Sequence, residues 1–194
     1  MPINDPHPEY QDAISKWEQC RDCFDGQAAI KAKSKVYLPR LSSQKDNDEG
    51  NEDYNEYKSR ATFFGFLSNT ISSYTGAAFF TEPEIDLGSE KLTNWSNDVD
   101  RDNLKLVDHI RDAFAEVLAI GRYIVYVDMM PTGGEPYFVS RKAEAVINWK
   151  HDENGNLSLV VIAEQYWEED PEDPYKLKAS IQWRELIIEE GRYK

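Results

Sequence analysis

The sequence predicts an α+β fold in which N-terminal amphipathic helices pack on a mainly antiparallel β-meander. Before residue 121, apolar residues recur every three or four positions in several segments, which is the period of one helix face. After residue 121, two apolar runs at 123–130 and 157–163 are rich in Val, Ile and Tyr, which suit a pleated sheet. Because helical segments come first and strands follow, the order favours α+β over alternating βαβ units.

Three helical segments are predicted. The first covers residues 9–25 and ends at Gly26, which favours a helix C-terminus. The second runs from Asn51 to about Phe80, as one long helix or as two with a break near Gly65, and we expect it to be largely buried. The third follows Asn103, a candidate N-cap, and ends before Gly121. Its apolar stripe comprises Leu104, Val107, Ile110, Phe114, Val117 and Leu118.

Three segments are predicted to lack regular structure. Residues 42–53 contain no apolar side chain, so this acidic stretch predicts a mobile loop. Residues 81–88 form an extended link around Pro83, and residues 168–174 form a second acidic loop. These segments separate the elements that carry the apolar patterns.

The sheet is predicted from its turns as well as its strands. Asn154-Gly155 lies between extended runs and favours a type I′ hairpin, in which both central residues take positive φ. Residues 147–149 lead into this hairpin, and residues 179–189 resume a strand pattern before a turn at Gly191. Because the chain stops soon after that turn, we expect the last hairpin to lack its partner strand.

Composition limits the possible functions. The net charge of −14 and a pI of about 4.6 argue against an electrostatic grip on nucleic acid, since phosphate binding needs clustered Lys and Arg. No run approaches the roughly 20 apolar residues that span a bilayer, and the polar N-terminus does not resemble a signal peptide. With only Cys20 and Cys23, no disulfide framework is possible, so we expect a reducing cytoplasm and no membrane association.

No catalytic or metal-binding constellation is predicted, and we expect a non-enzymatic protein without cofactors. Cys20 and Cys23 lie in mid-helix without a second ligand pair, which favours two buried or half-buried thiols over zinc or redox chemistry. Three acidic clusters, at 46–48, 98–102 and 152–156, lack the Gly and Glu that an EF-hand loop requires, so solvated loop carboxylates are the better interpretation. A hydrolase that uses an unrecognised carboxylate pair stays open as an alternative.

A short basic tract stands out in this acidic chain: Lys31, Lys33, Lys35 and Arg40. Such a charge run is most often an exposed loop face. The functional alternative is a subunit interface that meets an acidic neighbour, for example another copy of the chain in a ring.

A series of landmarks along the chain adds a family resemblance. They are the helix end DCFDG at 22–26, Ile30-Lys31, Tyr37-Leu38-Pro39-Arg40, Tyr54, Arg60-Ala61, the link 76–83, residues 116–119 with Gly121-Arg122, Pro136-Tyr137, Ile147-Asn148-Trp149, Gly155 and Leu159-Val160-Val161. Their order resembles the N-terminal part of a tailed-bacteriophage portal protein, the head-to-tail connector, of a portal-like family.

The resemblance implies a structural protein of the virion that forms a ring, typically dodecameric, at one capsid vertex. Double-stranded DNA passes through such a ring during genome packaging and ejection without tight binding. The implied partners are further copies of the chain, the terminase large subunit, the capsid and head-completion or adaptor proteins. The implied locations are the portal vertex and, during assembly, the host cytoplasm.

Residues 1–194 would form one wing-like domain, with a helical part at 1–120 and a sheet part at 121–194. Portal proteins also have stem helices, a clip and often a crown, so we expect this sequence to be a truncated portal or a natural short relative. The alternative is a monomeric or dimeric phage adaptor, an interaction module with a portal-like fold.

Overall fold

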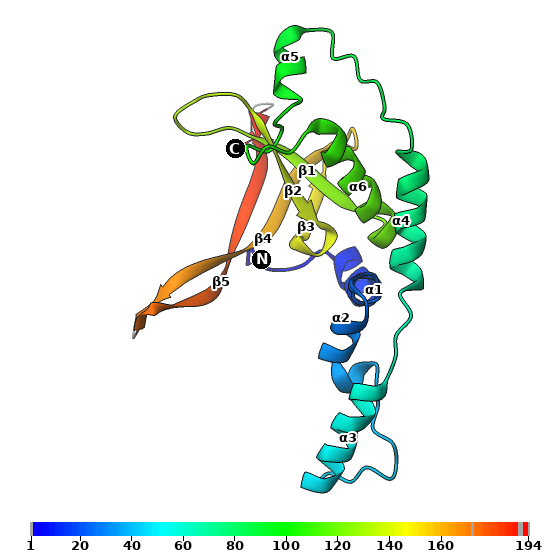
Figure 1. Cartoon of the computed structure of the whole chain (residues 1–194). Helices are drawn as coiled ribbons and strands as arrows, with labels where there is room; N and C mark the ends of the chain where they lie inside the picture. Colours follow the sequence, from blue (N-terminus) through cyan, green and yellow to red (C-terminus); the bar gives the residue numbers. More distant parts are fainter. Residues whose placement is uncertain (1, 172, 190–191, 194) are drawn as a thin grey trace. The chain divides into compact units, whose positions relative to one another are not determined.

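The computed structural model of the chain describes residues 2–171, 173–189 and 192–193 (Figure 1). Helices and antiparallel strands together confirm the predicted α+β class. The chain divides into two compact units: Met1–Trp17 with Arg122–Lys194, and Glu18–Gly121. One division lies near residue 121, where the helical part was expected to end, and the other lies within the first helix, α1 (Pro8–Asp25). That the two parts make one wing-like domain stays a prediction.

The unit Glu18–Gly121 is helical. After α1 it contains α2 (Gln27–Ala32), the 3₁₀ turn η1 (Ser34–Val36), α3 (Asp48–Arg60), α4 (Phe66–Ala78), α5 (Glu90–Trp95) and α6 (Leu106–Ile120). Arg21 of α1 donates two hydrogen bonds of 2.8 Å to the Glu116 carboxylate of α6. Phe79, just after α4, meets Phe114 of α6 edge-on, with ring centroids 5.8 Å apart. Helices α1 and α4 are therefore both tied to α6.

Helix α3 corrects the expectation of a loop at 42–53, because residues 48–53 are helical. The Asn47 side chain caps this helix and accepts a hydrogen bond from the Gly50 amide at 2.9 Å. Asp48 and Glu49 in the first turn interact favourably with the helix dipole. The buried Tyr54, only 5% exposed, anchors the helix one turn later. Because residues 48–53 contain no apolar side chain, apolar periodicity did not predict this helix start, which depends on capping and charge.

Helix α4 confirms the predicted break near Gly65, since α3 ends at Arg60 and α4 starts at Phe66. The expectation that this segment is largely buried is wrong. Ile71 is buried, but Phe66 and Tyr74 of the same helix are 75% and 64% exposed. The apolar residues of α4 are thus divided between the core and the surface.

Helix α6 ends as predicted, because Gly121 adopts the left-handed conformation with φ of 87° and its amide bonds to the Val117 carbonyl. Its start differs from the prediction. Asn103 is not the N-cap but lies in a loop with φ of 68°, and its amide bonds to Asp98 Oδ1. The helix begins only at Leu106, and in the loop before it the Leu104 amide bonds to Asp100 Oδ1 and the Leu106 amide to the Ser96 carbonyl. Val117 and Leu118 of the predicted stripe are nearly half exposed.

The other unit contains the sheets. Strands β1 (Tyr123–Asp128) and β2 (Tyr137–Lys142) form a two-stranded sheet. Strands β3 (Val146–His151), β4 (Leu157–Asp170), β5 (Asp173–Glu189) and β6 (Arg192–Tyr193) form a second sheet in sequence order, and η2 (Ala143–Ala145) precedes β3. All pairings in the described residues are antiparallel, as predicted. The core of this unit consists of Val146, Trp149, Val160 and Ile162, against which Tyr10, Ile124, Tyr126, Ala145 and Leu186 pack.

The turn between β3 and β4 lies where the sequence predicted it, but its type is different. Gly155 has φ of 81°, whereas Asn154 does not take positive φ, so the turn is not type I′. The Gly155 amide instead bonds to the Asp152 carbonyl at 3.0 Å, and Asp152 Oδ1 accepts from the Asn154 and Asn156 amides. This pattern corresponds to a type I turn followed by a left-handed Gly. The Asp152 side chain decides the turn type.

The acidic loop expected at 168–174 is mostly strand. Residues 163–170 of β4 pair with 173–183 of β5, and the pairing continues to Asp170 opposite Asp173. Cross-strand pairs such as Glu168 with Lys178 place opposite charges together, which stabilises extended structure in a polar segment. Strand β6 pairs with the end of β5, so a short partner strand exists where none was expected. The predicted turn at Gly191 lies outside the described residues.

Candidate functional site

The predicted basic tract lies in the helical unit, and its lysines differ in their surroundings. Lys31 Nζ donates to the Ser59 carbonyl at 2.8 Å. Lys33 Nζ lies 2.8 Å from Asp22 Oδ2, and hydrogen bonding to this carboxylate raises the pKa of Lys33. Lys35, in η1, is exposed. At least two of the three lysines thus make contacts within their own unit.

Arg40, the fourth member of the tract, holds a loop in place. Its Nη1 donates to the Lys45 carbonyl at 2.8 Å, its Nη2 bonds to Asn51 Oδ1, and the guanidinium lies 5.3 Å from the centre of the Tyr54 ring. These contacts connect the residues before α3 to α3 itself. That the tract as a whole meets an acidic neighbour stays a prediction.

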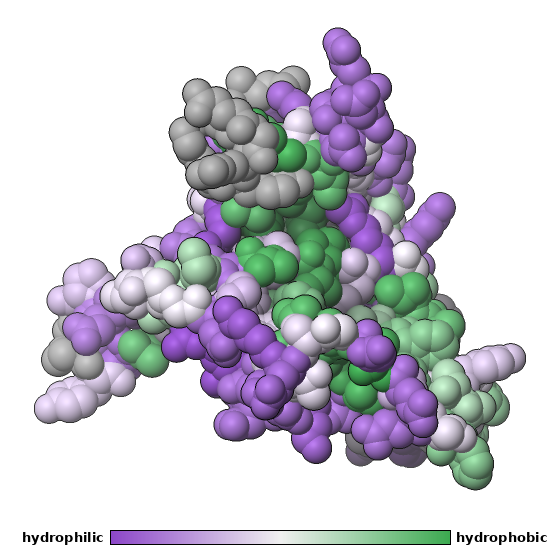
Figure 2. All heavy atoms as spheres, turned by 90° about the horizontal axis from the view of Figure 1, so that it is seen from above, coloured by the Kyte–Doolittle hydropathy of each residue, from purple (hydrophilic) through white to green (hydrophobic). Residues whose placement is uncertain are grey.

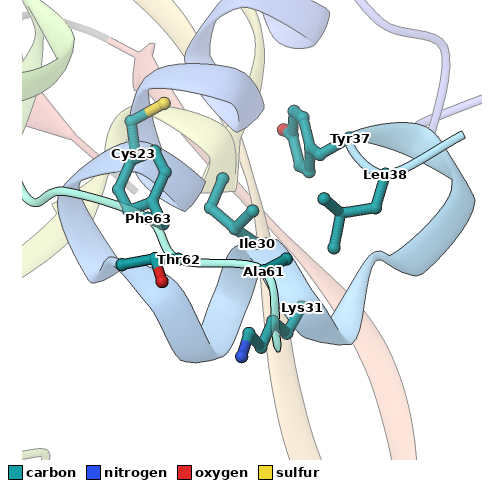
Figure 3. A pocket seen from close by; sticks show the side chains of 8 residues that line it. All are labelled: Cys23, Ile30, Lys31, Tyr37, Leu38, Ala61, Thr62 and Phe63. Carbon is teal, nitrogen blue, oxygen red and sulfur yellow. The ribbon is translucent and has the colours of Figure 1, made fainter. Parts of the chain in front are cut away.

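A cavity of about 280 Å³ lies beside the tract (Figure 3). Its lining is mostly apolar and comprises Cys23, Ile30, Lys31, Tyr37, Leu38, Ala61, Thr62 and Phe63. The Tyr37 hydroxyl donates to Asp22 Oδ2 at 2.5 Å. Burial, reinforced by this hydrogen bond, raises the pKa of Tyr37 to about 12. Tyr37 therefore stays protonated at neutral pH and serves as a hydrogen-bond donor.

The other candidate groups occupy ordinary structural positions. Cys20 and Cys23 are free, partly buried thiols within α1, as predicted. In the cluster at 98–102, Asp98 and Asp100 accept hydrogen bonds from nearby backbone amides. Backbone amides, together with the side chain of Asn156, also lower the pKa of Asp152. Among the described residues, no group of three or more His, Cys, Asp or Glu side chains is arranged to hold a metal ion.

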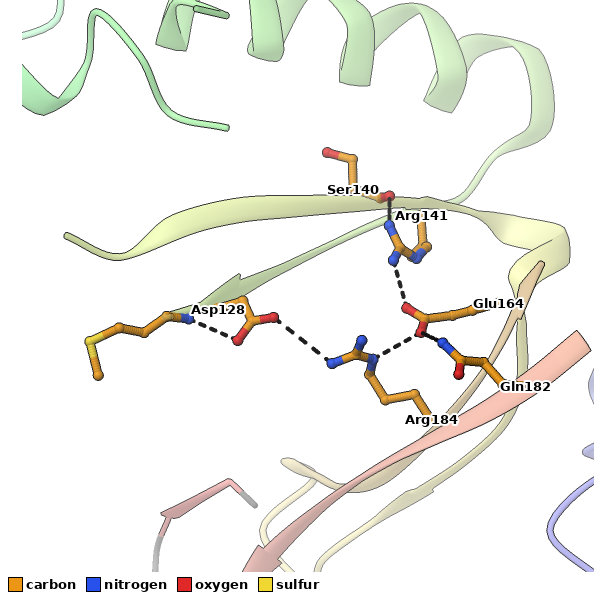
Figure 4. Close-up of polar contacts among 7 residues, drawn as sticks. Asp128, Ser140, Arg141, Glu164, Gln182 and Arg184 are labelled. Carbon is orange, nitrogen blue, oxygen red and sulfur yellow. Dashed lines mark hydrogen bonds and ion pairs between the residues drawn. The ribbon is translucent and has the colours of Figure 1, made fainter. Parts of the chain in front are cut away.

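A polar cluster connects the two sheets (Figure 4). Glu164 of β4 accepts a hydrogen bond from Arg141 of β2 at 2.6 Å and another from Arg184 of β5 at 3.1 Å. Burial alone would raise the pKa of Glu164, but the two guanidinium groups outweigh it and hold the pKa below its usual range. Gln182 donates to the same carboxylate at 3.2 Å, and Arg184 also lies 3.9 Å from Asp128 of β1. The cluster stabilises the charged form of a buried carboxylate.

An aromatic stack lies near the start of the same unit. The His7 ring stacks on Trp149 with centroids 4.2 Å apart. The Arg122 guanidinium lies 4.1 Å from the centre of the Trp149 ring and 5.7 Å from that of Trp17. Burial lowers the pKa of Arg122, but the group stays charged at neutral pH. The stack attaches the N-terminal segment and the start of α1, up to Trp17, to the sheet.

Two uncharged, exposed surfaces are the features that sequence reasoning missed. The ribbon face lies on the hairpin of β4 and β5 and consists of Ala163, Gln165, Trp167, Ala179, Ile181 and Trp183. The α4 face consists of Phe66, Asn69, Thr70, Ser73, Tyr74 and Ala77. Hydrophobic residues are visible at the molecular surface in the space-filling view (Figure 2). The alternation of apolar and polar residues in 179–183 was the available signal for the ribbon face.

No protein-family model matches the sequence, and no curated protein is similar to it beyond chance. None of the helices among the described residues is long and apolar enough to cross a membrane.

Proposed function

We propose that this chain is the wing part of a tailed-phage portal subunit, a non-enzymatic structural protein that assembles into a ring at the capsid vertex. In this role it forms part of the conduit for genome packaging and ejection and of the head-to-tail junction. Its partners are other copies of the chain, the terminase large subunit, the capsid and head-completion proteins. The segment acts in the virion and, before that, in the host cytoplasm.

One observation carries the proposal: landmarks that are far apart in sequence contact one another. Tyr37 bonds to Asp22, and both belong to landmark motifs. Tyr54 donates its hydroxyl proton to the Leu38 carbonyl at 2.9 Å and lies beneath the Arg40 guanidinium. These landmark residues were matched to the family by their order in the sequence alone, yet they also contact one another in the fold. The contacts support a resemblance of fold.

The same pattern occurs in the sheet-containing unit. Arg122 follows Gly121 in one landmark, and it stacks on Trp149, the last residue of another landmark. If the landmarks resembled a portal protein only by chance, their residues would not be expected to contact one another in both units. The acidic charge of −14 also suits a conduit, because few phosphate contacts would slow the passage of DNA.

The assembly state tests the proposal. The chain, purified alone and within its longest native form, is studied by light scattering and negative-stain imaging. Rings with a central hole are the expected result for the longest form. A monomer or dimer at every concentration would instead favour the adaptor alternative and overturn the ring.

DNA binding gives a second test. We expect weak binding to double-stranded DNA that falls steeply with salt, since any contact depends on few basic side chains. Affinity is measured by fluorescence anisotropy over a series of salt concentrations. Sub-micromolar binding at physiological salt would contradict passage without tight contact.

A further inference from the structure

The outer half of the β4–β5 hairpin is a two-stranded ribbon with open edges. Strand β3 pairs with β4 only as far as Ile162, and β6 pairs with β5 only at 188–189. Beyond these points the described residues of β4 and β5 pair only with each other, and the ribbon extends away from the β3 end of the sheet (Figure 1). An isolated two-stranded ribbon is marginally stable in water, so an apolar face on it calls for a covering surface.

The two faces of this ribbon differ in character. On one side, Glu168 accepts hydrogen bonds from Ser180 and Tyr166, and Glu164 is bound by its arginines. On the other side lies the ribbon face, where Trp167 is 62% and Ile181 is 57% exposed. A hollow of about 320 Å³ lies between Ala163, Gln165, Ala179 and Ile181. The polar side satisfies its own groups, whereas the apolar side is exposed.

The α4 face is likewise uncharged and exposed. None of the 13 residues of α4 is charged, although 30% of the whole chain is. Phe66 and Tyr74 project from it with 75% and 64% exposure, and a hollow of about 400 Å³ lies along them. Aromatic residues without charge are typical of the centre of a protein interface.

The net charge of the chain indicates what covers the ribbon face. Each copy carries a net charge of −14, so two copies repel each other overall, and a contact between two uncharged surfaces brings no further acidic groups together. The ribbon face and the α4 face are two such surfaces. Their lengths also agree, because five extended residues cover about 13 Å and the helical span from Phe66 to Ala77 covers about 16 Å.

We propose that the ribbon face of one copy docks on the α4 face of a second copy, with Trp167 and Tyr74 at the centre of the contact. The two surfaces are different, so the contact is head-to-tail: the first copy keeps its α4 face free and the second keeps its ribbon face free. Such a contact can continue around a ring. The inference rests on the proposed function in that a ring subunit has other copies as its neighbours.

Complementation between two variants tests the contact. Trp167→Glu places a charge on the ribbon face, and Tyr74→Glu places one on the α4 face. Each variant alone is expected to associate at least about tenfold more weakly than the unmodified chain in sedimentation velocity experiments. An equimolar mixture still contains one intact pair of surfaces, so it is expected to form dimers and nothing larger.

Matched controls separate the contact from added charge. Met129→Glu and Leu92→Glu also replace exposed apolar side chains, 57% and 46% exposed, one in each unit. We expect both to associate like the unmodified chain, and circular dichroism verifies the fold of all four variants. Equal losses in the controls would overturn the proposed contact.

Other outcomes also decide the inference. If the unmodified chain is monomeric at every concentration, a different partner or the chain itself covers the ribbon face, and the proposal fails. If Tyr74→Glu has no effect while Trp167→Glu does, the ribbon does not dock on α4. If rings still form with both variants, the proposed function stays intact and this contact is overturned. If the unmodified chain forms only open chains or dimers, and both variants weaken them, the contact is supported and the ring is overturned.

Discussion

Glu164 of β4 accepts a hydrogen bond of 2.6 Å from Arg141 of β2, so a single carboxylate joins the two sheets of one unit. The Glu164 side chain is 8% exposed, whereas Arg141 and Arg184 are 29% and 41% exposed. The Glu164 carboxylate is thus buried, whereas the two arginine side chains that bind it are partly exposed to solvent. A buried charge of this kind is tolerated only when its hydrogen bonds are satisfied.

We expect Glu164→Gln to lower the free energy of unfolding by about 1–3 kcal/mol, because the amide keeps the shape but leaves two guanidinium groups without their counter-charge. The partial exposure of both arginines keeps the loss below that of a fully buried pair. Urea unfolding followed by tryptophan fluorescence measures the change. Glu185→Gln, at an exposed position of β5, is the control and should stay within about 0.5 kcal/mol of the unmodified chain. Equal effects of the two changes would contradict a special role for Glu164.

The same residue predicts a pH dependence. Folding lowers the pKa of Glu164 below its ordinary value of 4.5, so the folded state binds its proton less readily than the unfolded state. The stabilisation is therefore complete above pH 4.5 and is lost as the pH falls through the lower folded value. Unfolding free energies of the unmodified chain and of Glu164→Gln, measured over this acid range, should converge as the pH falls. A difference that is constant or grows in acid would refute this account.

Local chemistry made part of the fold predictable. The left-handed Gly121 after α6 follows from glycine, which adopts this conformation at little cost, whereas Gly65 at the break before α4 has an ordinary φ of −72°. The type of the turn at Gly155 depended on the Asp152 side chain, which competes for the amides of that turn. Where one side chain determines which of two local structures forms, the composition of the segment is not sufficient to predict the structure.

The sites depended on pairings over long distances in the sequence. The two arginines that hold Glu164 lie 23 and 20 residues away from it, and only the register of β4 against β5 brings Arg184 alongside. The ribbon face has the same origin, because Trp167 and Ala179 are neighbours only through that register. The basic tract was visible in the sequence, but its internal contacts with Asp22 and Asn51 were not.

Two glycines in the helical unit predict opposite effects of the same substitution. A Cβ at Gly50 would lie 1.9 Å from the Lys45 carbonyl oxygen, whereas a Cβ at Gly76 would meet no atom within 4 Å. Gly50→Ala should destabilise the start of α3 by about 1–3 kcal/mol, because the backbone before the helix must move. Gly76→Ala should stabilise α4 by about 0.5–1 kcal/mol, since alanine loses less entropy in a helix. Thermal unfolding measures both changes, together with hydrogen exchange of the α3 amides for Gly50→Ala and of the α4 amides for Gly76→Ala. Destabilisation by both variants would contradict the geometry.

The ion pair of Arg21 with Glu116 predicts a strong coupling between α1 and α6. Its side chains are 11% and 17% exposed, and two parallel hydrogen bonds fix its geometry. A double-mutant cycle of Arg21→Met and Glu116→Gln should give a coupling energy of about 1–3 kcal/mol, measured by urea unfolding.

The Arg111–Asp108 pair within α6 is the matched comparison, because its side chains are 43% and 46% exposed. Its cycle, with Arg111→Met and Asp108→Asn, should give only about 0.3–0.5 kcal/mol, as solvent screens an exposed pair. Added salt should reduce the coupling of the exposed pair more than that of Arg21 with Glu116, since ions reach only the exposed charges freely. Equal couplings and equal salt dependence would mean that burial does not strengthen the contact between α1 and α6.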